Sequence, residues 1–170
     1  MITPTWAQTM ARYNRWQNRS LFDAADALPD DERRRDRGAF FGSIHGTLSH
    51  LLWGDRMWLS RFTDVERPRT SQAESPTFVE DWDELKALRA ETDDALDAWA
   101  GGMTEATLQG EYRWFSGSAG REVGRPMALV VMHVFNHQTH HRGQVHAMLT
   151  AAGARPGDTD LFLMPQEDAR

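Results

Sequence analysis

The sequence predicts an all-α protein that forms a four-helix bundle. Four segments repeat apolar residues at intervals of three and four, the pattern of a helix that is buried along one side. Two of these segments open on a capping residue followed by proline, Thr3-Pro4 and Ser75-Pro76, which favours the first turn of a helix. The 170 residues are enough for one core, so we expect a single domain over residues 1–170.

The first two helices precede a long polar connection. The first is expected from Pro4 to the proline at position 29, with an apolar side formed by Trp6, Met10, Tyr13, Leu21, Ala24 and Leu28. The second is expected over about residues 42–62, with an apolar side formed by Ile44, Leu48, Leu51, Leu52, Trp58, Leu59 and Phe62. Residues 63–77 then lack apolar periodicity and contain two prolines. A connection of this length can return the chain along the bundle, which permits parallel second and third helices in a crossover topology.

The last two helices are separated by a short segment of strand character. The third is expected from Ser75-Pro76 to Gly101-Gly102, because glycine is common where helices end. The fourth is expected from Pro126 to Gly153. Between them, GEYRWFSGSAGREVGRP is compatible with a small hairpin. After the fourth helix, we expect an apolar group to pack on the body of the protein, namely Leu161, Phe162 and Leu163.

Composition excludes several classes of function. A net charge of −6 and a pI of about 5.6 disfavour binding to nucleic-acid phosphates. The arginine-rich run at 31–38 is interrupted by acids, and we expect a solvated loop there. No apolar run approaches the roughly 20 residues that span a bilayer, and the first residues do not resemble a signal peptide. The chain has no cysteine, which is compatible with a cytoplasmic location, and most of its seven tryptophans are expected in the core.

Histidines are concentrated in the fourth predicted helix. The stretch HVFNHQTHHRGQVH holds five of the seven histidines. At about 100° per residue, His137 and His141 fall in the same sector as the apolar residues and His133 falls at its edge. His140 lies farther out, and His146 lies on the opposite side. Two core-facing histidines four residues apart can present nitrogens to one metal ion, but a complete site needs a ligand from another helix.

The second predicted helix supplies the two remaining histidines. Both His45 and His50 lie near the edges of its apolar face, so helical periodicity does not choose between them. Asp55 falls in the middle of that face, where a carboxylate needs a partner. A pH-sensing cluster is disfavoured because charged histidines on adjacent turns repel one another. A Ser/His/Asp site is disfavoured because the chain has no nucleophile elbow.

Two segments resemble the DinB family of metalloenzymes. They are NHQTHHRGQVHAML in the fourth helix and GTLSHLLWGDRMWL in the second, and the resemblance extends over nearly the whole chain. It implies a four-helix bundle of up-down-down-up topology, with a long crossover between helices two and three. It also implies a metal held by three histidines, which correspond here to His50, His137 and His141. Homodimers are common in the family, and a homodimer is therefore expected.

Three histidines would leave at least one coordination position open, as in catalytic metal sites. Neutral imidazoles favour Zn²⁺ or Ni²⁺ and are also compatible with Fe, Mn, Co or Cu. Three residues are candidates for supporting roles around the metal: Gln144, Asp55 and His133. Gln144 is placed to hydrogen-bond a ligand, whereas Asp55 is expected either to orient a ligand or to form a buried ion pair with Arg142.

The resemblance further implies a class of reaction. Some relatives in the superfamily are metal-dependent transferases or isomerases that use an external low-molecular-weight thiol. We therefore expect a thiol-dependent S-transferase-like or hydrolase-like activity on a small molecule. The alternative is a non-catalytic metal-binding protein of the stress response. A role on DNA is disfavoured by the acidic charge, and no membrane partner is expected.

Overall fold

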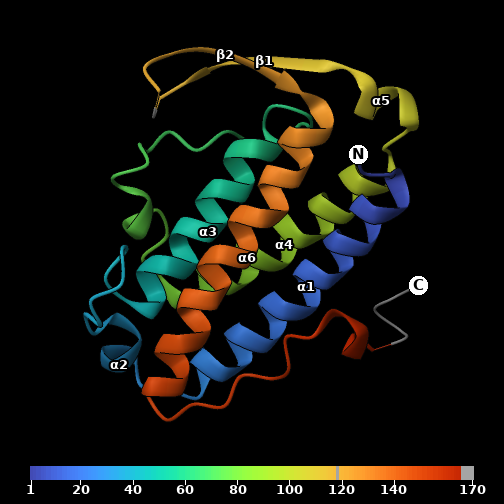
Figure 1. Ribbon diagram of the computed structural model, residues 1–170. Helices are drawn as coiled ribbons and strands as arrows, with labels where there is room; N and C mark the ends of the chain where they lie inside the picture. The colour runs from blue at the N-terminus through green and yellow to red at the C-terminus, as the bar shows by residue number, and fades with distance from the viewer. Residues whose placement is uncertain (118, 166–170) are drawn as a thin grey trace.

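The computed structural model describes residues 1–117 and 119–165 (Figure 1). The described chain is mostly helical, as predicted. Its α-helices are α1 (Pro4–Asp26), α2 (Asp30–Arg34), α3 (Ile44–Leu59), α4 (Trp82–Gly101), α5 (Glu105–Gln109) and α6 (Met127–Ala151). Two 3₁₀ turns are present, η1 (Ser75–Thr77) and η2 (Leu161–Leu163). The expected hairpin is also present, as antiparallel strands β1 (Glu111–Ser116) and β2 (Arg121–Pro126).

Side-chain caps explain where the long helices begin. Thr3 accepts a hydrogen bond from the Trp6 amide at the start of α1, and Ser43 does the same for Gly46 at the start of α3. The predicted start of the third helix at Ser75-Pro76 is wrong. That segment forms only η1, and α4 begins at Trp82 with Asp81 as its cap. The Ser75 side chain is hydrogen-bonded to the His50 ring and to the Gln72 carbonyl.

The four long helices enclose the core. Helix α1 packs against α4 and α6, and α3 packs against the same two helices. Figure 1 shows α3 and α6 side by side, with the hairpin across the end of the structure where α6 begins. The connection after α3 returns along that helix, because η1 also packs on α3. This return brings Ser75 beside the middle of α3, where it meets His50.

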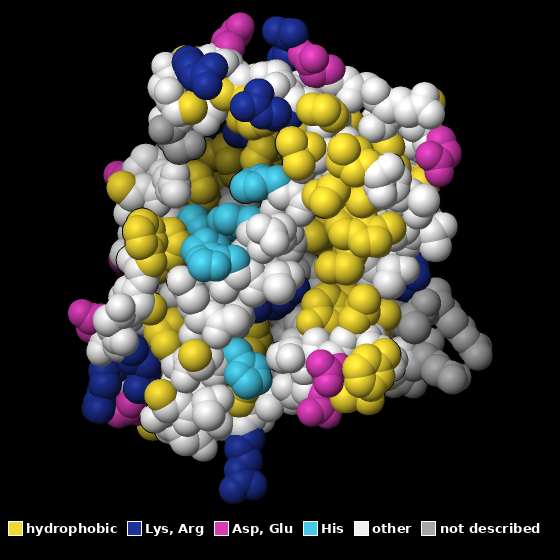
Figure 2. Space-filling view, in the orientation of Figure 1, with side chains coloured by type: hydrophobic (Ala, Val, Ile, Leu, Met, Phe, Trp, Pro, Cys, Tyr) yellow, Lys and Arg dark blue, Asp and Glu magenta, His cyan; other side chains and the backbone are white. Residues whose placement is uncertain are grey.

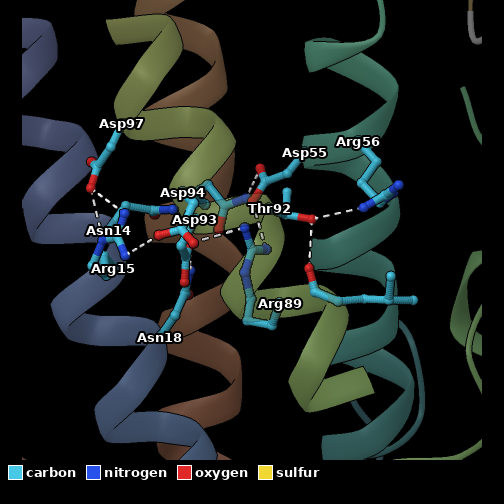
Figure 3. Close-up of polar contacts among 12 residues, drawn as sticks. Asn14, Arg15, Asn18, Asp55, Arg56, Arg89, Thr92, Asp93, Asp94 and Asp97 are labelled. Carbon is cyan, nitrogen blue, oxygen red and sulfur yellow. Dashed lines mark hydrogen bonds and ion pairs between the residues drawn. The ribbon is translucent and has the colours of Figure 1, made fainter. Parts of the chain in front are cut away.

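A network of buried charges lies within this core (Figure 3). Arg89 of α4 forms ion pairs with Asp55 of α3 at 2.7 Å and with Asp93 at 3.0 Å, and all three side chains are at most 4% exposed. Asn18 of α1 donates to Asp93 at 2.9 Å, and Gln138 of α6 donates to Asp55. The network therefore joins all four long helices. The expected ion pair between Asp55 and Arg142 is not formed. The Arg142 guanidinium donates instead to Asn14 of α1.

Two predictions about exposure hold in part. The arginine-rich run at 31–38 is mostly exposed, but its first residues belong to α2, and Arg33 is buried with its guanidinium carbon 4.5 Å from the centre of the Trp82 ring. Of the seven tryptophans, all within the described residues, Trp82 is buried and the other six are half-buried; Trp6, Trp58 and Trp99 pack against the core.

The C-terminal tail also differs from the prediction. Leu161, Phe162 and Leu163 form η2 but stay 44%, 83% and 46% exposed, so they do not pack into the body. Polar contacts hold the tail instead. The Tyr13 hydroxyl donates to the Thr159 carbonyl at 2.5 Å, and Gln17 donates to the Asp158 carbonyl at 2.8 Å.

Among the described residues, no helix is both long and apolar enough to cross a membrane.

The buried network predicts a large difference between two positions on α4. Arg89→Met removes the cation between two buried carboxylates, and we expect a loss of about 3–5 kcal/mol in the free energy of unfolding. Lys86→Met is the matched control, because Lys86 also pairs with two carboxylates but is 34% exposed. Its loss should be at most about 1 kcal/mol. Urea unfolding measures both values, and equal losses would contradict a special role for the buried network.

Candidate metal centre

Three histidines from two helices meet at one point. His50 lies on α3, and His137 and His141 lie one turn apart on α6. One nitrogen of each ring is available as a ligand, and these nitrogens lie within 4.8 Å of one another. Figure 2 shows histidine side chains gathered on the face of the molecule formed by α3 and α6. The three residues that the family resemblance selected are thus brought together, and as a group they could hold a metal ion.

The distance between the Nε2 atoms of His50 and His137 is compatible with binding of one zinc ion by both. The Nε2 atoms of His50 and His137 are 3.2 Å apart. A tetrahedral zinc ion with Zn–N bonds of about 2.0–2.1 Å would place two ligand nitrogens roughly 3.3 Å apart. The separation of these two nitrogens is therefore compatible with both of them binding one such ion.

Hydrogen bonds set the tautomers of two of the rings. The single proton of the Ser75 hydroxyl is directed to the Gln72 carbonyl, so its oxygen accepts a bond from Nδ1–H of His50 at 2.7 Å. In His141, Nδ1–H donates to the Gln144 amide oxygen at 2.8 Å. In both rings Nε2 is therefore unprotonated, and in His50 it lies at hydrogen-bond distance from Nε2 of His137. Gln144 thus bonds one of the three histidines, while its part in metal binding stays a prediction; the contact of Ser75 with His50 was not predicted.

Burial keeps the rings neutral. Removal from water, reinforced by the neighbouring histidines, lowers the pKa of His50 and of His137 to about 3. Burial also lowers the pKa of His141, although its bond to Gln144 opposes this. Metal ions bind the neutral imidazole, and near pH 7 all three rings are in that form.

Two residues that the sequence did not single out shape the site. The Phe41 ring stacks on His50 with centroids 3.7 Å apart and also contacts His141 at 5.3 Å. At Gly54, an added Cβ would lie 3.1 Å from Cε1 of His137, which is tighter than ordinary contact. The glycine therefore provides the room that the His137 ring occupies. The sequence signal for Gly54 was its place in the HLLWGD segment, four residues after His50.

The remaining candidates lie outside the three-histidine group. His45 bonds the Val79 carbonyl at 2.9 Å, so the two histidines of α3 have different roles. The His133 ring lies beyond His137, at a centroid distance of 6.0 Å. Asp55 has its hydrogen bonds and ion pair with Arg89 and Gln138, not with a histidine. Burial raises the pKa of Asp55 to about 6, although the charge of Arg89 opposes this.

A cavity of about 1430 Å³ opens beside His50 and His137. Its walls come from three parts of the chain: the second half of α3, the connection at residues 67–74, and the hairpin with the start of α6. Three of the half-buried tryptophans line it, namely Trp53, Trp58 and Trp114. Figure 2 shows this hollow as an apolar recess next to the histidines, with Lys or Arg side chains on its upper rim. A small molecule can therefore reach the histidines from one side.

Comparison with known proteins agrees with the resemblance seen in the sequence. The model of the DinB family matches residues 1–169. The relative named Protein DinB, from Bacillus subtilis (strain 168), is 25% identical over 172 residues, which cover 96% of this chain and 98% of the relative. No solved structure shows significant similarity to the chain.

The burial of the histidines predicts an unusual titration. In the metal-free protein, we expect His50 and His137 to stay neutral at about pH 5, since their pKa is lowered to about 3 from the ordinary value of about 6.5. The unfolded chain takes up protons between these two values and the folded chain does not, so acid should destabilise the fold in that window. Long-range nitrogen–proton NMR correlations report both protonation and tautomer. A midpoint near pH 6.5, or a His50 ring protonated at Nε2, would contradict this description.

Proposed function

Because the chain belongs to the DinB family, we propose that it binds one divalent metal ion through His50, His137 and His141. The observation that carries the proposal is the convergence of three neutral imidazoles within 4.8 Å, two of them with Nε2 left unprotonated by hydrogen bonds at Nδ1. The proposal includes the up-down-down-up bundle that the family implies. The mutual packing of α1, α3, α4 and α6 supports that part.

The donor set favours Zn²⁺ or Ni²⁺ among the divalent ions. Such an ion would act as a Lewis acid and lower the pKa of a water or thiol at the position that the protein leaves open. The residues around it would hold it in place. Ser75 and Gln144 orient the rings of His50 and His141, and Phe41 covers one side of His50.

We further propose that the site is catalytic and acts on a small molecule. The cavity beside His50 and His137 supports this, because a purely structural metal has no need of access from solvent. The reaction we favour is a thiol-dependent S-transferase-like one, with hydrolysis as a variant. Since the chain has no cysteine, the thiol would come from outside the protein. A homodimer and a cytoplasmic location stay predictions.

Metal content tests the ligands. We expect elemental analysis to find about one divalent ion per chain in the wild-type protein and at least a tenfold loss of affinity in His50→Ala, His137→Ala and His141→Ala. The controls are His140→Ala, which changes an exposed neighbour of His141, and His45→Ala, which changes the other histidine of α3. Both controls should keep the metal. Undiminished metal in the three ligand variants would refute the assignment.

Turnover separates an enzyme from a metal-binding stress-response protein. The wild type, loaded with Zn²⁺ or Ni²⁺, would be assayed with several low-molecular-weight thiols and electrophiles, beside the metal-free protein and His137→Ala. Product that forms only with metal and the intact histidines is the expected result. Full metal occupancy without turnover of any combination of thiol and electrophile would favour the non-catalytic alternative.

A further inference from the structure

One cation in the cavity has no anionic partner among the described residues. Arg61 lies in the turn that follows α3 and lines the same cavity as His137. Its guanidinium carbon is 4.2 Å from the centre of the Trp58 ring and 5.8 Å from that of Trp114. The side chain therefore packs between two aromatic walls of the cavity. Such stacking leaves the in-plane N–H groups of a guanidinium free to bind a planar anion.

No anionic group neutralises Arg61 among the described residues. Its Nη1 atom is buried and has no hydrogen-bond partner, and no carboxylate lies within ion-pair distance. Burial lowers the pKa of Arg61; Tyr112 opposes this, and the like charge of Arg67 adds to it. A half-buried cation in this state costs free energy that the fold does not recover. A ligand that supplies an anionic group would recover it.

Positively charged side chains outnumber negatively charged ones in the lining of the cavity. Its charged lining residues are Arg61, Arg67, Arg69, Arg125 and Glu74. The one acid among them already accepts hydrogen bonds from the amide and hydroxyl of Ser71. The chain as a whole carries a net charge of −6, so this local excess of arginine runs against its overall balance. An excess of positive charge in a cavity with aromatic walls attracts organic anions.

The cation and the histidines lie along one wall. The Trp58 ring, which contacts Arg61, also lies 5.2 Å from the His133 ring, and His133 is followed by His137 at 6.0 Å. A single ligand in the cavity can therefore contact Arg61 at one end and approach the three-histidine group at the other.

We infer that Arg61 binds the carboxylate or phosphate group of a small organic anion, whose apolar part packs on Trp58 and Trp114. The inference rests on the proposed function in that it gives the class of substrate for that site. Arg61 is a specificity-determining residue here, distant from the reacting atoms. Arg67 and Arg125 add positive charge around the bound group.

The test uses the full-length protein and two aromatic anions, benzoate and phenyl phosphate, with benzamide as a neutral counterpart. Isothermal titration calorimetry on metal-free and metal-loaded protein gives the dissociation constants. Arg61→Met removes the charge and keeps an extended side chain, while Arg61→Lys keeps the charge without the planar fork. Arg69→Met is the matched control, since Arg69 lines the cavity but is 92% exposed and pairs with Glu66. Circular dichroism checks that each variant is folded.

We expect the wild type to prefer the anions to benzamide, and Arg61→Met to bind the anions at least about tenfold more weakly with benzamide unaffected. Arg61→Lys should fall between the two, and Arg69→Met should stay within about twofold of the wild type. Metal content should be unchanged in Arg61→Met, so failure of the metal site and failure of the anion subsite are separate results. Equal binding of the anions by wild type and Arg61→Met, or no preference of the wild type for anions, would overturn the inference.

Discussion

Asp55, Arg89 and Asp93 form a buried ion network that, with Asn18 and Gln138, links the four long helices. Charges in a protein interior are tolerated only when they are paired and hydrogen-bonded, so these residues fix how the helices that carry them can pack. Asp55 accepts from Gln138, and this bond ties α3 to α6 directly beside the histidines. Gln138 is the residue after His137, and Asp55 is five residues after His50. The same contact that satisfies a buried carboxylate thus sets the spacing of the two helices that present the three imidazoles.

The properties of the site follow from this packing. Between closely packed helices, the rings of His50, His137 and His141 are removed from water, which favours their neutral form. The long connection after α3 adds Ser75, whose hydroxyl directs the His50 proton away from the other two rings. The same connection, the hairpin and the second half of α3 line a cavity with aromatic walls and a positive charge at Arg61. The cavity that carries the positive charge of Arg61 therefore also reaches His50 and His137 of the three-histidine group.

Local sequence signals predicted the parts of the structure that depend on near neighbours. Helical periodicity placed His137 and His141 toward the core, and glycine closed the last helix, where Gly153 adopts a φ of +83°. Periodicity could not decide whether His45 or His50 is the metal-ligand candidate, because both lie at the edges of one helix face. The resemblance to the family motif was needed to select His50. Phe41, Ser75 and Arg89 were missed because their roles come from contacts between segments far apart in the chain. The start of α4 was misplaced for a related reason, since the Ser75 side chain bonds the His50 ring, a contact that the local sequence does not show.

The most direct test of the central proposal is X-ray absorption spectroscopy of the protein loaded with one equivalent of Zn²⁺. Three imidazole nitrogens at about 2.0–2.1 Å, with one oxygen ligand from solvent, are expected from the geometry of His50, His137 and His141. A shell with fewer than three imidazoles, or one made of carboxylate and water oxygens alone, would show that these histidines do not hold the metal.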